Sequence, residues 1–355
     1  MRTFPSFLAL TLLVSACTAR EVLDLGGNSN RDESFPDGGV GAAGPDGSYP
    51  PDVSVPYSPP DTGTPLQVPP NNGSSGPTGV IAPSCDAGTC ELVAHEWAPR
   101  NLVIDGPYLY WLNQESGTSP VSLMRVLTAG GPVEQYAAVQ AADLNAYGMT
   151  LTAYGDALYW LPSFVPSAVV QKTALDGTNR TALPMAASTA QGSGFSTNGN
   201  LLAWVTQYDP VASIVTMPIA GGTPTTILSN VGGPEALAID GTNAYWVLVS
   251  GDAGAVRGDL MKTPLDGGPT SVLVPGIGNV SGSVATDGVN VYWLSPPGFA
   301  ATDAGVNSVM KVPVNGGAPA AVASVSSFAS EVVVDDTSLY VVSPPDGTIS
   351  KITPK

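Results

Sequence analysis

The sequence has few positively charged residues. Only 12 of its 355 residues are lysine or arginine, against 29 aspartates and glutamates, and the formal net charge is −17. Nucleic acids are bound through clustered basic side chains that neutralise phosphates, and anionic lipid headgroups attract the same kind of surface. We therefore expect no nucleic acid as a partner, and any membrane attachment must come from something other than a basic face.

The sequence also lacks the residue sets of common catalytic centres. It has one histidine, His95, so a four-ligand zinc site is not expected. It contains no Gly-x-Ser-x-Gly elbow, phosphate-binding loop or His-Glu-x-x-His motif. Paired carboxylates for glycoside cleavage stay open, because their separation is a structural quantity. We predict no catalytic residue and expect His95 to be structural, within a strand over residues 91–96.

The N-terminal apolar run, residues 7–14, is too short to span a bilayer and follows a basic Arg2. These features predict a secretory signal. The run leads into Val14-Ser15-Ala16-Cys17, which resembles the lipobox of bacterial lipoproteins. The resemblance implies a signal over residues 1–17 and lipid attachment at Cys17, since acyl chains hold a soluble domain on a membrane. An ordinary signal peptide with a chance cysteine is the alternative. Thr18 follows, rather than aspartate, so we expect the outer membrane or the cell surface.

Residues 18–84 are rich in Gly, Pro and Asp and have few aromatics, so they cannot bury enough apolar surface to fold. We predict a disordered tether there, followed by a folded domain over residues 85–355. Cys85 and Cys90 lie at its start, and a close pair in an exported chain predicts a disulfide.

The folded region carries a repeat of the form Asp-Gly-x-x-x-Tyr-Trp, complete or degraded. Its tyrosine position recurs six times, at steps of 42 to 49 residues, at Tyr110, Tyr159, Ala203, Tyr245, Tyr292 and Tyr340. This period is close to that of a propeller blade. Adjacent residues of a strand point to opposite faces, so the tyrosine and tryptophan of each pair should bury against different neighbouring blades.

The two ends of the repeat array are each incomplete. The last repeat stops after its third strand, residues 348–353, whereas residues 91–96 precede the first repeat as an unpaired strand. If the N-terminal strand completes the last blade, the ring closes and no sheet edge is left free there. We therefore predict an all-β fold, a six-bladed β-propeller closed by an N-terminal strand.

The repeated Asp-Gly-x-x-x-Tyr-Trp, followed by Met-Lys-x-Pro-x-Asp-Gly-Gly, resembles the Tyr-Trp-Thr-Asp class of six-bladed propellers and the wider TolB-like group. The resemblance covers residues 91–355 and extends to secreted propeller lipoproteins. The Thr-Asp that follows the aromatic pair in that class is replaced here, for example by Leu112-Asn113. The polar network that this aspartate implies is therefore not expected.

Three residues enter the first strands of their repeats on the face where propellers usually hold ligands: Asn101, Ser283 and Glu331. Glu235 lies one residue ahead of the matching position in its own repeat. They resemble the positions that hold a divalent ion in gluconolactonase-type propellers, and Ca²⁺ takes six to eight oxygen ligands. A structural role at the channel is the alternative, which we favour. A recurring cation on the third strands is also expected to be structural, paired with carboxylates or solvated, at Arg125, Lys172, Lys262, Lys311 and Lys351.

Longer loops on the same face carry acids, a cation and aromatics that could form a rim for a carbohydrate or peptide. These residues are Glu115, Phe164, Tyr208, Asp209, Asp252, Arg257, Phe299 and Asp303. We expect a membrane-tethered, non-enzymatic binding or scaffold module for a protein, peptide or glycan. A divalent-metal-dependent lactonase- or lyase-like enzyme is the alternative, and a subunit of an envelope assembly held by its blade edges is a third.

Overall fold

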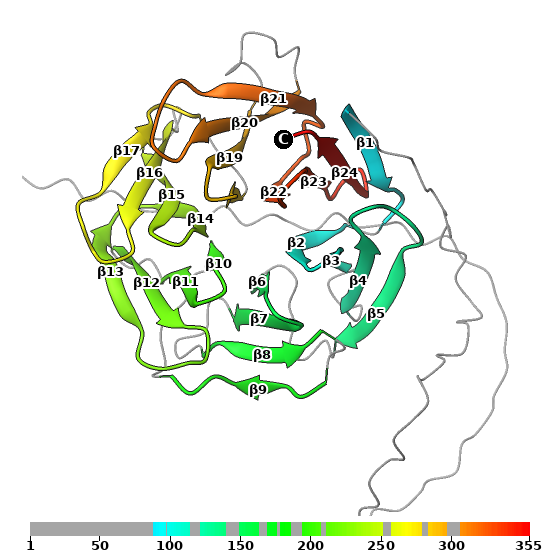
Figure 1. Cartoon of the computed structure of the whole chain (residues 1–355), viewed down its shortest axis with the longest axis horizontal. Coiled ribbons are helices and arrows are strands. Elements are labelled where there is room, and N and C mark those ends of the chain that lie inside the picture. Colours follow the sequence, from blue (N-terminus) through cyan, green and yellow to red (C-terminus); the bar gives the residue numbers. More distant parts are fainter. Residues whose placement is uncertain are drawn as a thin grey trace, which may run out of the picture. The chain divides into compact units, whose positions relative to one another are not determined.

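The computed structural model describes residues 88–96, 98–113, 121–139, 149–162, 169–175, 178–185, 194–206, 211–250, 257–278, 283–296 and 306–355. The strands in these ranges form six antiparallel sheets of four strands each, arranged as blades around a central axis (Figure 1). The predicted six-bladed β-propeller is therefore confirmed. Within this part of the chain no helix is long and apolar enough to cross a bilayer.

Each blade runs from a first strand at the centre to a fourth strand at the outside. Blade 1 consists of β2 (Arg100–Asp105), β3 (Tyr108–Asn113), β4 (Val121–Leu127) and β5 (Glu134–Val139). Blade 2 consists of β6 (Met149–Ala153), β7 (Ala157–Pro162), β8 (Gln171–Ala174) and β9 (Thr181–Ala182). Blade 3 consists of β10 (Phe195–Thr197), β11 (Leu201–Val205), β12 (Ala212–Pro218) and β13 (Thr225–Val231). Blade 4 consists of β14 (Pro234–Ile239), β15 (Asn243–Ser250), β16 (Arg257–Pro264) and β17 (Ser271–Val274). Blade 5 consists of β18 (Val284–Thr286), β19 (Asn290–Ser295), β20 (Asn307–Pro313) and β21 (Ala320–Val325).

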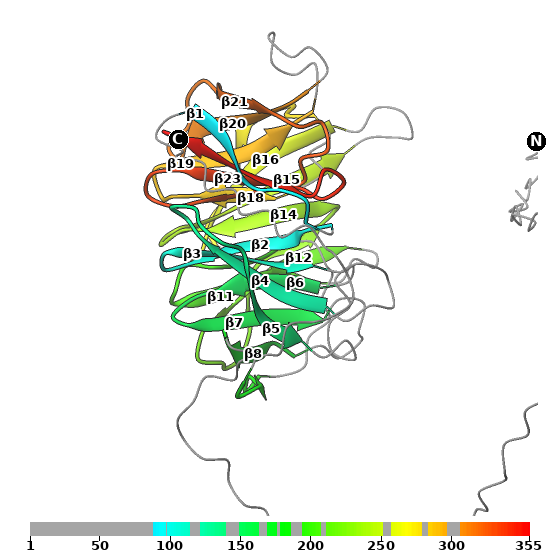
Figure 2. The same cartoon turned by 90° about the vertical axis from the view of Figure 1, so that its right-hand side faces the viewer.

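Blade 6 is built from both ends of the domain. Its inner strands are β22 (Glu331–Val334), β23 (Leu339–Ser343) and β24 (Thr348–Thr353), and its outer strand is β1 (Gly88–Val93). β1 pairs antiparallel with β24, from Gly88 opposite Thr353 to Val93 opposite Ile349. Figure 2 shows the ring from the side, with β1 beside the strands at the C-terminus. The predicted closure is confirmed.

The closing strand lies a few residues earlier than predicted. It ends at Val93, so the expectation that His95 belongs to it was wrong. His95 lies in the connection to β2 and has a left-handed backbone, with a φ of 62°. The same connection is fixed to the β23–β24 turn, because the backbone N–H of Glu96 donates to the carbonyl of Gly347 at 2.9 Å.

Aromatic side chains of the second strands form the core between neighbouring blades. The tyrosine of one blade packs in the same buried cluster as the tryptophan of the next, as in Tyr110 with Trp160 and Tyr340 with Trp111. Where one partner is replaced, the cluster persists, as in Ala203 with Trp246. The prediction that the two aromatics bury against different blades is therefore confirmed.

The aspartate of the repeat joins the turn after the first strand to this aromatic core. In blade 6, Asp335 Oδ1 accepts from the backbone N–H groups of Thr337 and Ser338, both at 2.7 Å, while Tyr340 donates its hydroxyl to Asp335 Oδ2 at 2.8 Å. The same contacts occur in blades 4 and 5 between Asp240 and Tyr245 and between Asp287 and Tyr292. Burial together with the bond to Asp287 raises the pKa of Tyr292 to about 12. This network differs from the one implied by the Thr-Asp class, because its aspartate ends the first strand and does not follow the aromatic pair.

Most strand-three lysines bridge to the next blade by bonding to a carbonyl. Lys262 donates to the carbonyl of Val314 at 2.8 Å, and Lys351 donates to that of Thr128 at 2.8 Å. Lys311 reaches the carbonyl of Lys355 at 3.3 Å, and Lys172 lies over the ring of Tyr159. Arg125 has the expected carboxylate partner, Glu134, at 2.8 Å. These cations are therefore part of the ring's internal bonding.

We predict that Gly347→Ala destabilises the closed ring more than a matched glycine substitution does. Gly347 has a φ of +67°, and a Cβ there meets the carbonyl oxygen of Glu96. Gly288 has a comparable φ of +78° with no atom near its Cβ position. Gly288→Ala should lower the free energy of unfolding by roughly 1–2 kcal/mol, and Gly347→Ala by about 3 kcal/mol or more, because overpacking adds to the strain. Urea unfolding measures both, and equal losses would contradict the contact.

We also predict a pH-dependent contribution from Asp335. Burial raises its pKa, but the bonds from the turn amides and from Tyr340 lower it by more, so the pKa lies below the ordinary 3.8. A lowered carboxylate pKa contributes stability above the unfolded-state pKa, and that stability is lost as pH falls through the folded-state pKa. Asp335→Asn should cost about 1–2 kcal/mol at neutral pH, and its difference from the unsubstituted chain should shrink below about pH 4.

The matched control is Asp336→Asn. Asp336 is the next residue along the chain and is exposed. Because its side chain is exposed, the substitution should leave the unfolding free energy at neutral pH nearly unchanged. A constant effect of Asp335→Asn from pH 7 to pH 3 would show that the ionised carboxylate contributes nothing.

Candidate functional site

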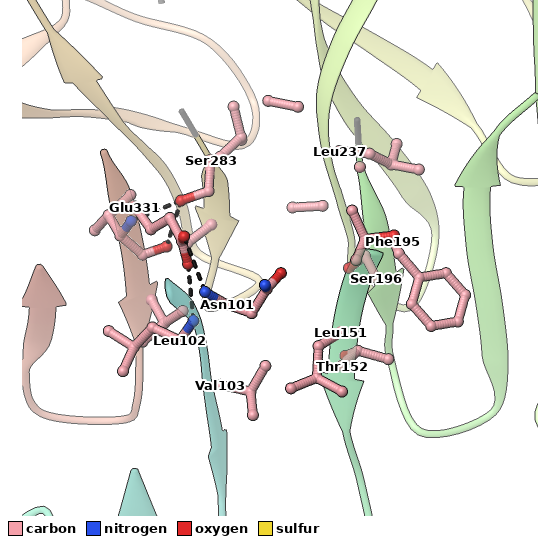
Figure 3. Close-up of a pocket in the computed structure, with 18 of the residues that line it drawn as sticks. Asn101, Leu102, Val103, Leu151, Thr152, Phe195, Ser196, Leu237, Ser283 and Glu331 are labelled. Atoms are coloured by element: carbon pink, nitrogen blue, oxygen red, sulfur yellow. Dashed lines mark hydrogen bonds between the residues drawn. The ribbon is translucent and has the colours of Figure 1, made fainter. Parts of the chain in front are cut away.

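The first strands of the blades enclose a central cavity of about 660 Å³. They contact one another in sequence order around the ring, and β22 contacts β2 to complete it. All six contribute residues to the wall: β2, β6, β10, β14, β18 and β22. Figure 3 shows the labelled side chains around this space. The three residues predicted at the channel, Asn101, Glu235 and Glu331, all line the cavity.

Glu331 joins the last blade to the first. Its Oε1 accepts from the backbone N–H of Asn101 at 3.0 Å, and its Oε2 accepts from that of Leu102 at 2.8 Å (Figure 3). Burial raises the pKa of Glu331 above its ordinary value, and these two bonds and the nearby Arg100 guanidinium offset only part of that rise. Both carboxylate oxygens are thus engaged in holding β22 to β2.

Two serines of the channel wall join neighbouring blades in a similar way. Ser283 Oγ accepts from the backbone N–H of Val332 at 2.6 Å and donates to its carbonyl at 3.0 Å. Ser196 Oγ accepts from the backbone N–H of Ile239 at 3.2 Å. Each contact links one first strand to the next, so several polar groups of the wall are structural.

Two first strands carry an extra residue in a left-handed conformation. The pairing of β2 with β3 shifts between Arg100 and Val103, and Asn101 there has a φ of 55°. The pairing of β14 with β15 shifts between Glu235 and Leu237, and Ala236 between them has a φ of 48°. A bulge of this kind bends the strand and redirects the side chains beside it. At both bulges the preceding charged residue, Arg100 or Glu235, lines the cavity.

Glu235 differs from Glu331 in its surroundings. It is exposed, and its carboxylate has no hydrogen-bond or ion-pair partner among the residues that the structure describes. Desolvation raises its pKa, with no cation or donor acting in the opposite direction. The cavity wall therefore presents one carboxylate that the fold does not use.

Asn101, Glu235 and Glu331, which resemble a divalent-ion site in the sequence, thus line one cavity. Their side chains differ in whether they are free to bind an ion. Within the described ranges, no group of three or more His, Cys, Asp or Glu side chains lies close enough to hold a metal ion. Because both Glu331 oxygens already accept backbone bonds, Glu235 is the uncommitted carboxylate of the set. Calcium binding stays the alternative to the structural role that the sequence favours.

Several predicted features lie outside the described residues. They are Cys17, the tether over residues 18–84, Cys85, and the rim residues Glu115, Phe164, Tyr208, Asp209, Asp252, Phe299 and Asp303. Arg257 begins β16. Cys90 lies on β1, and its pairing with Cys85 stays a prediction.

Comparisons with known proteins concern the fold. No protein-family model and no curated protein matches this sequence. Among solved structures, the chain is similar to a chain of the nidogen/laminin complex, with 13% identity and a TM-score of 0.47 over 66% of this chain and 84% of that one. It is similar to TolB from Acinetobacter baumannii, with 13% identity and a TM-score of 0.47 over 70% of this chain and 64% of that one. It is also similar to a calcium-binding protein, regucalcin, from Agrobacterium tumefaciens, with 15% identity and a TM-score of 0.47 over 75% and 93%.

The sequence interpretation missed Arg100 and Ser196 as residues of the channel wall. The repeat alignment placed the channel entry four residues before the turn aspartate, which selects Asn101, Ser283 and Glu331. Ser196 lies two residues further along its strand, and Arg100 lines the cavity beside the bulge at Asn101. No sequence signal marks a bulge at a residue other than glycine.

We predict that the two channel glutamates differ in their effect on stability. In Glu331→Gln only one side-chain oxygen remains for two backbone donors, so the free energy of unfolding should fall by about 1–3 kcal/mol. Glu235→Gln makes the same chemical change in the same cavity at a residue that has no partner within the described ranges, and stability should not fall. Urea unfolding of both variants at neutral pH provides the measurement. Equal losses would mean that Glu235 also holds the fold together.

Proposed function

We propose that this chain is a non-enzymatic binding module that holds a protein or glycan partner at the mouth of its central channel. The observation that carries the proposal is the cavity of about 660 Å³, to which all six blades contribute. Its size is in the range of ordinary ligand sites. Because the wall consists of first strands bonded blade to blade, the cavity is preformed, which reduces the ordering that binding requires.

The bonding of the wall favours binding over catalysis. A general acid, a base or a metal ligand needs a side chain that is available to the reacting group. Glu331, Ser283 and Ser196 instead bond to the backbone of neighbouring blades. The sequence motifs for activated nucleophiles are absent. These polar groups keep the cavity in a fixed shape, and a cavity of fixed shape favours binding of a partner over catalysis.

We further propose that the propeller is attached to a membrane, at the outer membrane or the cell surface, through a lipid on Cys17. Support comes from the apolar run before Val14-Ser15-Ala16-Cys17 and from the Gly- and Pro-rich residues 18–84 behind it. A lipid anchor with a long tether would place the channel at a distance from the bilayer. This arrangement fits a module that captures partners in the envelope.

The alternative is a divalent-metal-dependent lactonase- or lyase-like enzyme. One observation favours it: Asn101, Glu235 and Glu331 line the same cavity. Binding of Ca²⁺ would require Glu331 to exchange its two backbone bonds for the ion, which opens the joint between β22 and β2. For this reason the binding module is the better-supported function.

Site-specific photo-crosslinking in cells that produce the full chain tests the proposal. A photoreactive residue replaces Thr150, which lines the cavity, or Val272, which is 52% exposed on the outer strand β17. We expect a discrete crosslinked product at Thr150 and none at Val272, and mass analysis distinguishes protein from glycan. Fractionation of the same cells should place the chain with membranes and Cys17→Ser in the soluble fraction. A product only at Val272, or none at Thr150, would contradict binding at the channel.

A further inference from the structure

We propose that the channel mouth recognises a basic side chain, the guanidinium or ammonium of an arginine or lysine on a protein partner, and that Glu235 forms the ion pair with it. This inference rests on the proposed binding function and specifies the chemistry of the partner. Its basis is the single carboxylate of the cavity wall that has no partner within the described residues.

The residue after Glu235 has a left-handed backbone although it carries a Cβ. Ala236 has a φ of 48°, and a left-handed conformation costs a residue with a Cβ roughly 1–2 kcal/mol. Glycine relieves such strain, and the corresponding position of blade 3 is Gly194, with a φ of +87°. Strained positions of this kind persist mainly at functional sites. The extra residue Ala236 shifts the pairing of β14 beside Glu235, which lines the cavity.

The charges of the cavity leave Glu235 uncompensated. Arg100 acts electrostatically on Glu331, in the direction of stabilising its charge. Glu331 also has two backbone donors. Among the residues that the structure describes, no cation or hydrogen-bond donor acts on Glu235, and burial raises its pKa. A cation that enters the cavity would therefore find one carboxylate whose charge the fold does not neutralise.

An organic cation fits this carboxylate better than a divalent metal ion does. A single carboxylate can bind a guanidinium or an ammonium group. With arginine, the two carboxylate oxygens can accept two parallel N–H bonds from the guanidinium. Ca²⁺ instead takes six to eight oxygens, and the neighbouring carboxylate, Glu331, is committed to Asn101 and Leu102. Hydroxyl-bearing residues such as Thr150 and Thr152 line the same cavity and offer acceptors for the remaining N–H groups.

The charge of the whole chain favours a basic protein as the carrier of that group. With a net charge of −17, the chain attracts basic partners over long range, and complementary charge raises association rates. A basic residue on an extended loop could enter the cavity while the rest of the partner contacts the surrounding face. Glu235 would then select the partner, and the acidic surface would accelerate its capture.

The test measures binding of three capped pentapeptides, Gly-Gly-Arg-Gly-Gly, its lysine version and its neutral norleucine version, to the full nitrogen-15-labelled chain by NMR titration. We expect saturable shifts with the two basic peptides and none with the neutral one. Glu235→Gln should weaken the affinity at least about tenfold, a loss of about 1.4 kcal/mol. The matched control is Asp336→Asn, which removes the same charge from an exposed turn at the other end of a first strand and should bind as the unsubstituted chain does.

Each other outcome overturns the inference. Equal affinity in Glu235→Gln would mean that the peptides bind the acidic surface non-specifically. Saturable binding of CaCl₂ that Glu235→Gln abolishes, without binding of the peptides, would assign Glu235 to a divalent ion. If no peptide binds while the photoreactive residue at position 150 still crosslinks a partner, the inference of a basic side chain on the partner is wrong. The proposal of a binding module would still hold.

Discussion

The structure depends on the packing of second-strand aromatic side chains between neighbouring blades. A buried cluster occupies every joint of the ring, and at four of the six joints it holds the tyrosine of one second strand and the tryptophan of the next. At the other two joints Ala203 and Val341 stand in for one member of the pair. A blade cannot bury both aromatics alone, so the blades stabilise one another. The joint between Tyr340 and Trp111 forms only when blade 6 lies beside blade 1. Closure by β1 is therefore a condition for the cavity at the centre.

Polar contacts reinforce these joints at both ends of the blades. On the turn side, lysines of the third strands bond to carbonyls of the next blade, as Lys351 does with Thr128. On the channel side, Glu331 and Ser283 bond to first-strand backbones. These charged and polar groups of the channel and of the third strands thus maintain the ring. Glu235 lines the cavity and makes no such bond to the residues that the structure describes.

The sequence predicts the fold well because the physical signals repeat. Six copies of one motif report the same strand positions, and the missing strand at one end matches the surplus strand at the other. The site is harder to predict. Glu331 bonds to a backbone 230 residues away, and Ala236, which gives no signal for a left-handed conformation, marks the bulge beside Glu235. The repeat motif also gives no signal that Asp335 accepts hydrogen bonds from both the turn amides and the hydroxyl of Tyr340 in the core.

Amide hydrogen exchange of the full chain tests the closed ring most directly. The amides of β1 that pair with β24 should be protected with the same free energy as those of β23 and β24, because all three strands belong to one blade that opens only when the ring unfolds. Exchange of the β1 amides that is orders of magnitude faster than in the rest of blade 6 would contradict this account. The N-terminal strand would then be a loosely held edge, and the cavity would not require the ring to be closed.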